Sequence, residues 1–286
     1  MSKKIVIASD STTDLGSELI SKYQIKILPL GVNIGDKHYM DGVDIDPEFI
    51  YKTYEETGVL PKTSAANIVD YNEFFSKYTA DGASLIFFSI SEEMSSTYRN
   101  AVLAAEDFEN VYVVDTRNLS TGGGLVVLSA CEMAEQGMAA SEIAEKCREI
   151  ATRVDASFII DNLEFLYKGG RCSAVAAFGA NLLQIKPCIM VRDGKMGVGK
   201  KYRGKFVQVL EKYIADMLGD ASDIELDKIF VTHAGCDTEI VDKCVEQVKK
   251  TAKFDNVYVT RAGCTVSAHC GRNTLGVLFI RKNIVK

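Results

Sequence analysis

Small hydroxyl side chains gather at four places along the chain where a predicted strand ends. The clusters are Ser9, Ser11, Thr12 and Thr13 around Asp10; Thr63 and Ser64; Ser95, Ser96 and Thr97; and Ser120 and Thr121 before three glycines. Ligands of parallel α/β sheets bind at the carboxyl ends of strands, where helix N-termini offer unpaired N–H groups. A single Ser or Thr there is usually a helix cap. Because one cap does not need three adjacent hydroxyls, the clusters favour a pocket for a carboxylate or phosphate.

Familiar phosphate-binding and nucleophile motifs are missing from the sequence. There is no G-x-x-x-x-G-K-[ST] loop, the run "STGGG" lacks the G-x-G-x-x-G spacing, and there is no G-x-S-x-G turn. The histidines are His38, His233 and His269, and His269 lies in "VSAHCGRNTLG", which we expect to be a loop. Both a structural role and a site role are open for it. Cys264 and Cys270 are too widely spaced for a zinc site, so we expect no metal or cofactor and interpret the eight cysteines as buried thiols.

Short apolar runs alternate with amphipathic segments, and these elements must position the hydroxyl clusters. We expect strands at residues 4–9, 25–35, 84–90, 111–115, 228–235, 256–263 and 275–282, and a hairpin over 187–199 with its turn at Asp193-Gly194. We expect helices from about residue 10 to 23 and at 44–58, 68–82, 96–108, 123–137, 139–154, 206–219 and 239–252. Asp46, Pro47 and Gly58 are typical of the two ends of a helix. The alternation predicts an α/β fold of two α/β domains with mostly parallel sheets.

Length and composition limit the class of protein. A chain of 286 residues is long enough to form two domains, and we expect an N-terminal domain at 1–155 and a C-terminal domain at 156–286. The formal net charge of -6 argues against nucleic acid as a partner, and we interpret the basic run at residues 200–205 as a solvated loop. No apolar run reaches the ~18 residues of a membrane span or forms a signal segment, so we expect a cytoplasmic protein.

Seven segments of the sequence together resemble the DegV family. They are "ASDSTTDL", "KTSAAN", "SEEMSSTYRNA", "VVDTRNLSTGGG", "LEFLYKGGRCS", "IKPCIMVRDGK" and "TVSAHCGRNTLG", which follow the family's order from about residue 5 to 280. The resemblance implies a fold of the EDD type and a protein that binds one long-chain fatty acid between its two domains. It also implies a carrier rather than an enzyme, which presents the carboxylate to a separate ATP-dependent fatty acid kinase. The acyl-phosphate formed there would serve phospholipid synthesis, with a transient membrane contact.

Family roles transfer to the residues that match each motif. Thr63 matches the Thr of the family's T-S-Q-P-S segment and Ser95 the second Ser of its S-x-x-x-S-G-T-Y segment, so they resemble the pair that hydrogen-bonds the carboxylate. Arg171 and His269 match residues near the same end, and Ser64 and Ser96 adjoin the pair. The chain departs from the family at Ala65-Ala66, at Ser96 and at Gly271-Arg272-Asn273. The last change predicts a large cation near the pocket mouth.

The wall of the apolar tunnel is harder to predict, because an apolar stripe is usually ordinary core. The candidates are Phe158, Ile160, Leu163, Phe165, Leu166, Phe178, Leu182, Leu183 and Ile189. Two other classes of function stay open from the residues alone. One is a phosphate- or nucleotide-handling enzyme that uses the same helix N-termini, with the "STGGG" run as its phosphate loop. The other is an interaction protein whose apolar groove binds a partner helix.

Overall fold

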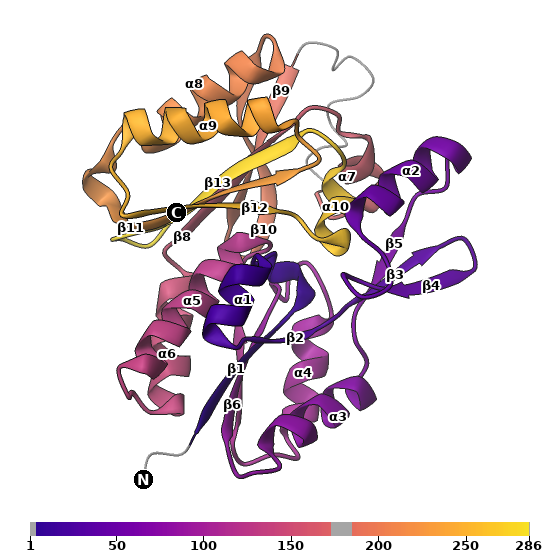
Figure 1. Cartoon of the computed structure of the whole chain (residues 1–286), viewed down its shortest axis with the longest axis vertical. Coiled ribbons are helices and arrows are strands. Elements are labelled where there is room, and N and C mark those ends of the chain that lie inside the picture. The colour runs from indigo at the N-terminus through magenta and orange to yellow at the C-terminus, as the bar shows by residue number, and fades with distance from the viewer. Residues whose placement is uncertain (1–3, 173–184, 286) are drawn as a thin grey trace.

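A computed structural model describes residues 4–172 and 185–285 of the chain, which form two lobes (Figure 1). The lobe with the N-terminus contains a parallel sheet in the order β2-β1-β6-β7. Its strands are β1 (Ile5–Asp10), β2 (Lys26–Leu28), β6 (Ser84–Ser89) and β7 (Val111–Asp115). Its helices are α1 (Ser17–Tyr23), α3 (Ile68–Thr79), α4 (Thr97–Ala105), α5 (Thr121–Glu135) and α6 (Ala140–Ala151), with a 3-10 turn at Ser11–Thr13.

The continuous apolar run of β6 is explained by helices on both faces of this sheet. Leu85 and Phe87 pack in one core cluster with buried side chains of α3 and α4. Ile86 and Phe88 pack in another cluster with side chains of α5 and α6. Successive side chains of a strand point to opposite faces, so a strand covered on both faces has no polar alternation. The predicted strand-helix order of this lobe is confirmed, and its four strands are parallel.

The second lobe contains a six-stranded sheet in the order β10-β9-β8-β13-β11-β12. Its strands are β8 (Val154–Ile160), β9 (Ile185–Arg192), β10 (Lys195–Arg203), β11 (Ile224–Ala234), β12 (Asn256–Arg261) and β13 (Thr274–Arg281). Among these six described strands, β11 and β12 pair in parallel and the other four pairings are antiparallel, so the prediction of a mostly parallel sheet is wrong for this lobe. β9 and β10 are antiparallel because a hairpin turn connects them directly. The last strand, β13, inserts between β8 and β11 and runs antiparallel to both.

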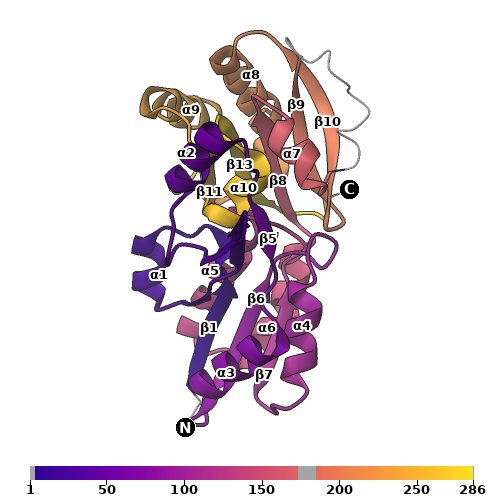
Figure 2. The same ribbon diagram turned by 90° about the vertical axis from the view of Figure 1, so that its right-hand side faces the viewer.

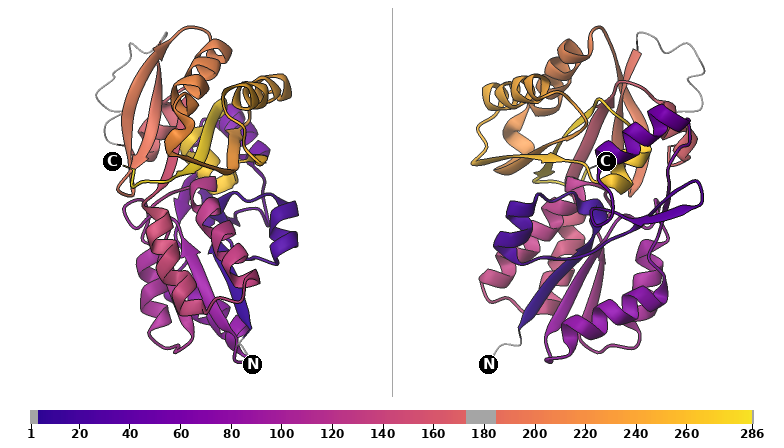
Figure 3. Two further views of the ribbon diagram at one scale, coloured as in Figure 1. Left: turned by 90° about the vertical axis from the view of Figure 1, so that its left-hand side faces the viewer. Right: turned by 45° about the vertical axis from the view of Figure 1, so that its right-hand side comes forward.

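Helices cover both faces of the six-stranded sheet, and one of them, α5, also packs against the parallel sheet. α8 (Phe206–Leu218) and α9 (Thr238–Thr251) lie side by side on the outer face of the six-stranded sheet (Figures 1 and 3), and a 3-10 turn at Ala221–Asp223 follows α8. The inner face presents Ala156, Phe230 and Leu278, which belong to the same core cluster as Leu125 and Val126 of α5. α5 is therefore packed between both sheets, which explains why its sequence is apolar on nearly every side.

A third, small sheet lies beside this junction and was not predicted. It has the order β4-β3-β5, formed by β3 (Gly31–Ile34), β4 (Lys37–Met40) and β5 (Lys62–Ser64). The predicted strand at 25–35 is in fact β2 and β3 in two different sheets, because Pro29 stands between them and cannot donate to a ladder. α2 (Pro47–Thr57), α7 (Glu164–Gly169) and α10 (Cys264–Cys270) pack against this sheet and each other, and Figure 2 shows α10 and β5 between the lobes.

Local signals in the sequence predicted several element ends correctly. The Asp46 carboxylate accepts a hydrogen bond from the Phe49 N–H at 2.8 Å, and Gly58 ends α2 with φ 69°. Asp193 and Gly194 have φ 50° and 77° in the β9–β10 turn, as a two-residue hairpin requires. The prediction of a loop around His269 is wrong, because this segment forms helix α10 (Cys264–Cys270). A helix of seven residues is not stable by itself, so contacts with the other lobe must hold it.

The predicted domain boundary between residues 155 and 156 lies inside β8, whose residues pair with β13. The division of the chain into two domains therefore stays a proposal about folding units. All eight cysteine side chains are buried, as predicted. Within residues 4–172 and 185–285, no helix is long and apolar enough to cross a membrane.

Candidate ligand-binding pocket between the sheets

A cavity of about 250 Å³ lies where the three sheets meet. The lobe with the N-terminus contributes Leu30, Thr63, Ser64, Ala65, Ile90, Met94, Ser95, Ser96, Leu119 and Ser120. The rest of the lining is Ala156, Phe158, Leu166, Arg171, Val191, Met196, Thr232, His233, Ala234, Ala262, Thr265, Val266, His269, Cys270, Thr274, Gly276 and Leu278. The six residues that the family resemblance placed at the ligand site, from four separate segments, therefore all line this one pocket.

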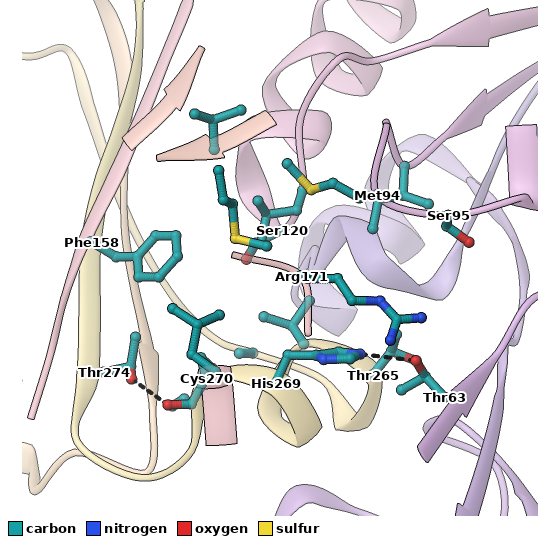
Figure 4. A pocket seen from close by; sticks show the side chains of 18 of the residues that line it. Thr63, Met94, Ser95, Ser120, Phe158, Arg171, Thr265, His269, Cys270 and Thr274 are labelled. Atoms are coloured by element: carbon teal, nitrogen blue, oxygen red, sulfur yellow. Dashed lines mark hydrogen bonds between the residues drawn. The ribbon is translucent and has the colours of Figure 1, made fainter. Parts of the chain in front are cut away.

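The pocket joins Thr63 of one lobe to His269 of the other. Thr63 lies in β5, opposite Val32 of β3, and its Oγ1 is 2.9 Å from Nε2 of His269 (Figure 4). Burial, with a smaller contribution from the nearby Arg171 cation, lowers the pKa of His269 to about 4. The imidazole is therefore neutral at pH 7, when one ring nitrogen donates a hydrogen bond and the other accepts one.

The "KGGR" stretch brings its backbone up to the imidazole of His269. A Cβ atom at Gly169 would lie only 2.5 Å from His269 Nδ1, so a side chain at this position displaces the ring. Gly170 follows in the left-handed conformation with φ 68° and ends α7. The chain then turns so that Arg171 donates from Nη1 to the Gly169 carbonyl at 2.9 Å. Arg171 is exposed and lines the pocket, so its cation lies at the solvent side.

Ser95 has a local structural contact as well as its place in the pocket. The Thr97 N–H donates to Ser95 Oγ at 3.2 Å, and the Ser95 and Thr97 hydroxyls are 2.7 Å apart. Ser95 therefore satisfies one N–H at the start of α4 through a local turn, whereas the side chain at the cap position, Ser96, makes no cap hydrogen bond. Ser96 precedes the first residue of α4 and is exposed at the pocket rim, and Ser64 Oγ accepts a weak hydrogen bond from Asn33 at 3.4 Å.

Two buried aspartates that the sequence analysis did not select hold α10 in place. Asp41 accepts hydrogen bonds from the N–H groups of Cys264 at 2.7 Å and Thr265 at 3.1 Å. Asp14 accepts from the Gly263 N–H at 2.8 Å and from the Ser120 hydroxyl at 2.5 Å. The side chains of Asp41 and Asp14 thus satisfy N–H groups at the helix start. They explain why the short helix forms and why His269 faces Thr63.

The carboxyl group of Asp14 has an unusual acidity. Burial, opposed by its hydrogen bonds and reinforced by the neighbouring charges of Asp41 and Asp10, raises the pKa of Asp14 to about 8. Burial also raises the pKa of Asp10, whose carboxylate accepts from the Ile90 N–H at 2.8 Å. The loop ends of this lobe are therefore organised by buried carboxyl groups.

The first hydroxyl cluster and the glycine run do not line the pocket. The Ser11 hydroxyl donates to Asp41 at 2.9 Å and the Thr12 hydroxyl to Asp10 at 2.5 Å, so this cluster supports the aspartates. Gly122, Gly123 and Gly124 are buried inside α5, where Cβ atoms would press on Asn118, Thr116 and Leu15. The Gly122 and Gly124 N–H groups donate to the carbonyl oxygens of Leu119 and Ser120, so the run does not present these N–H groups as an open phosphate loop would.

The apolar part of the pocket was only partly predicted. Phe158 and Leu166 line it, whereas Ile160, Leu163 and Ile189 are packed in an adjoining core cluster and Phe165 packs against Tyr51 and Tyr54. Phe178, Leu182 and Leu183 lie outside the described residues. Figure 4 shows Phe158 on the side of the pocket opposite Thr63, Arg171 and Ser95. The missed apolar residues, such as Met94, Leu119 and Leu278, come from separate elements and share no sequence pattern.

Arg272 does not reach the pocket mouth, contrary to the prediction. Its guanidinium lies 4.6 Å from the ring centre of Tyr51, and Nη2 is 2.6 Å from a carboxylate oxygen of Glu48. Glu48 also pairs with Arg261, and Arg272 with Glu55. Since Tyr51, Glu48 and Glu55 belong to α2, the departure from the family's glycine-proline sequence adds an attachment for this helix rather than a charge in the pocket.

The lining combines two kinds of surface. Thr63, Ser95, Arg171 and His269 gather on one side of the pocket, and Thr274 lies near Phe158 on the other (Figure 4). Thr232 and His233 also line the pocket, and most of the remaining side chains are aliphatic, aromatic or thioether groups. Within the described residues, no group of three His, Cys, Asp or Glu side chains is arranged to hold a metal ion. Such a lining is complementary to a small anionic head group that carries an apolar chain.

The fold is that of a two-lobed α/β protein with a candidate binding pocket at the junction of the lobes. The chain belongs to the DegV family: a family model described as "Uncharacterised protein, DegV family" matches residues 4–282. A DegV domain-containing protein of Clostridium acetobutylicum is 34% identical over 285 residues, which are 98% of this chain and 99% of the relative.

Solved structures of DegV proteins share the whole architecture. A DegV family protein from Thermus thermophilus, described by its fatty acid binding, has a TM-score of 0.88 at 26% identity and matches 97% of this chain and 99% of its own. A stearic acid-binding protein from Eubacterium ventriosum has a TM-score of 0.84 at 27% identity, with 99% of each chain covered. Structural relatives of this chain thus bind fatty acids.

Proposed function

We propose that this protein binds one long-chain fatty acid, with the carboxylate at Thr63 and Ser95 and the tail in the apolar part of the pocket. Arg171, His269, Ser64 and Ser96 orient the head group. The observation that carries this proposal is the convergence of all six side chains on one pocket whose opposite side holds Phe158. The fatty acid binding described for the relatives from Thermus thermophilus and Eubacterium ventriosum supports the choice of ligand.

The energetics divide affinity and orientation between the two ends of the ligand. A tail of about 15 methylenes contributes roughly 12 kcal/mol gross at about 0.8 kcal/mol each. Association costs on the order of 4–15 kcal/mol, and each hydrogen bond to the carboxylate returns about 1.5–3 kcal/mol. The tail therefore offsets most of the cost of association, and the head-group contacts decide which class of lipid is retained.

The Thr63–His269 pair sets the direction of hydrogen bonding at the head group. When Nε2 of the neutral imidazole donates to Thr63 Oγ1, the Thr63 hydroxyl proton is available for the carboxylate. Ser95 acts in the same way, because its Oγ accepts from the Thr97 N–H and its own proton can turn to the ligand. The exposed Arg171 adds a screened attraction at the solvent side.

We propose further that the protein is a carrier without turnover of its own. It presents the carboxylate to a separate ATP-dependent fatty acid kinase, which forms the acyl-phosphate used in phospholipid synthesis, and it contacts membranes only transiently. Domains at 1–155 and 156–286 and a cytoplasmic location belong to the same proposal. The position of Arg171 and Ser96 at the solvent side of the pocket gives a partner access to the head group.

The test begins with the purified protein. Organic extraction and mass spectrometry are expected to recover one fatty acid per chain, and delipidated protein is expected to bind added palmitate or stearate. The same preparation is expected to show no ATP hydrolysis. A folded protein that yields no acyl chain and binds neither acid would overturn the proposal, and ATP turnover by the chain alone would overturn its carrier role.

A further inference from the structure

We propose that Thr265 is a further head-group ligand, which rests on the proposed function and adds a donor that the motif comparison did not select. Thr265 lines the pocket and is only 6% exposed. Its Oγ1 has no hydrogen-bond partner in the part of the chain that the structure describes. Buried hydroxyls are nearly always hydrogen-bonded, so an orphaned one beside a pocket indicates a partner that comes from outside the chain.

The backbone of Thr265 is fixed from the other lobe. Its N–H donates to Asp41 Oδ2 at 3.1 Å, while the neighbouring Cys264 N–H donates to Oδ1 of the same carboxylate. Asp41 is itself buried, and its Oδ2 accepts a hydrogen bond from the Ser11 hydroxyl at 2.9 Å. A hydroxyl on a backbone held this firmly loses little further conformational entropy when it meets a ligand.

Helix geometry places Thr265 on the face of α10 that carries His269. The two residues are four positions apart, and side chains at that spacing lie one above the other on a helix. His269 in turn reaches Thr63 at 2.9 Å, and Figure 4 shows the three side chains together on one side of the pocket. The Thr265 hydroxyl thus lies near Thr63 and His269 on the side of the pocket where we place the carboxylate.

The chemistry of the hydroxyl fits a carboxylate. Thr265 Oγ1 carries one proton that no described residue accepts, and an ionised carboxylate is acceptor-only. Thr63, Ser95 and Thr265 then form three neutral donors around the two oxygens. A hydrogen bond to a charged acceptor is stronger than one to a neutral acceptor, so Thr265 discriminates in favour of acids over alcohols with the same tail.

Two substitutions separate this role from a structural one. Thr265→Val keeps the shape and removes the hydroxyl, and Thr265→Ser keeps the hydroxyl. Thr265→Val is expected to weaken stearate binding about 10-fold or more in titration calorimetry, and 1-octadecanol binding by less. Thr265→Ser is expected to stay within about 3-fold of the wild type for stearate.

The thermal unfolding midpoint of the ligand-free protein gives a second measurement. Thr265→Val should weaken binding and yet make the ligand-free protein more stable. Thr265→Val is expected to raise the midpoint, because the orphaned hydroxyl is lost. Thr232→Val is the contrast: that buried hydroxyl contacts Thr121 at 2.6 Å and Thr260 at 3.0 Å, so its loss should lower the midpoint. Equal stearate affinity in wild type and Thr265→Val, or a lowered midpoint in Thr265→Val, overturns the Thr265 role alone. A wild type that binds no stearate overturns the proposed function as well.

Discussion

Thr63 Oγ1 and His269 Nε2 lie 2.9 Å apart, although 206 positions separate these residues in the chain. Thr63 is on the small antiparallel sheet of one lobe, and His269 is on helix α10, which precedes β13 of the other lobe. The pair closes the polar side of the pocket, so any change that separates the lobes also separates the two groups.

Replacement of Thr63 by Val is expected to weaken fatty acid binding about 10-fold or more, since a hydrogen bond to a charged group contributes about 1.5–3 kcal/mol. Thr63→Ser keeps the hydroxyl and should bind nearly as well as the wild type. Thr238→Val, at an exposed position at the start of α9, is the control. Titration of delipidated protein with stearate measures all three, and unchanged affinity in Thr63→Val would remove Thr63 from the head-group site.

Acid is expected to destabilise the protein through His269. The pKa of His269 is lowered to about 4 in the folded protein, against an ordinary value of 6.5. As pH falls from 6.5 to 4, the unfolded chain takes up a proton that the folded chain does not, so stability is lost in that window. Urea unfolding at pH 7 and pH 5 should show a larger loss for the wild type than for His269→Gln. Equal losses would mean that the imidazole titrates normally.

Gly169 is expected to tolerate no side chain. A Cβ atom there would meet His269 Nδ1 at 2.5 Å, so Gly169→Ala should displace the imidazole from Thr63 and weaken fatty acid binding. Gly197 in β10 has no atom within 4 Å of its Cβ position, which makes Gly197→Ala the matched control. Binding titrations compare the two variants, and similar affinities would show that the pocket does not depend on this close approach.

Asp14 is expected to act on stability in the opposite direction to His269. Its pKa is raised to about 8 in the folded protein from an ordinary value of 3.8, so the folded state keeps a proton that the unfolded chain releases. Stability from this group is present below pH 3.8 and is lost as pH rises toward 8. Asp14→Asn, which can still accept from the Gly263 N–H, should lose less stability between pH 5 and pH 9 in urea titrations. A pH dependence equal to that of the wild type would contradict the raised pKa.

Local sequence signals predicted the elements whose stability is local. The caps of α2, the turn of the β9–β10 hairpin and the apolar run of β6 each depend on residues that are neighbours in the chain. The site residues also came from motifs within short segments, and the structure brings these segments together in one pocket.

Features that depend on contacts between the lobes were missed. Helix α10 was expected to be a loop, because the carboxyl groups that hold its N-terminus, those of Asp14 and Asp41, are more than 200 residues away in the chain. The antiparallel pairing of β13 with β8 and β11 follows from where β13 inserts, which no local pattern records. Thr265 could have been found from its four-residue spacing to His269, but only once the helix was known.

The most direct measurement is a crystal structure of the protein with stearate. The account predicts one elongated ligand between the lobes, with its carboxylate oxygens within hydrogen-bond distance of Thr63 Oγ1 and Ser95 Oγ and its tail passing Phe158. A head group at the Phe158 side, or stearate bound only outside this pocket, would contradict it.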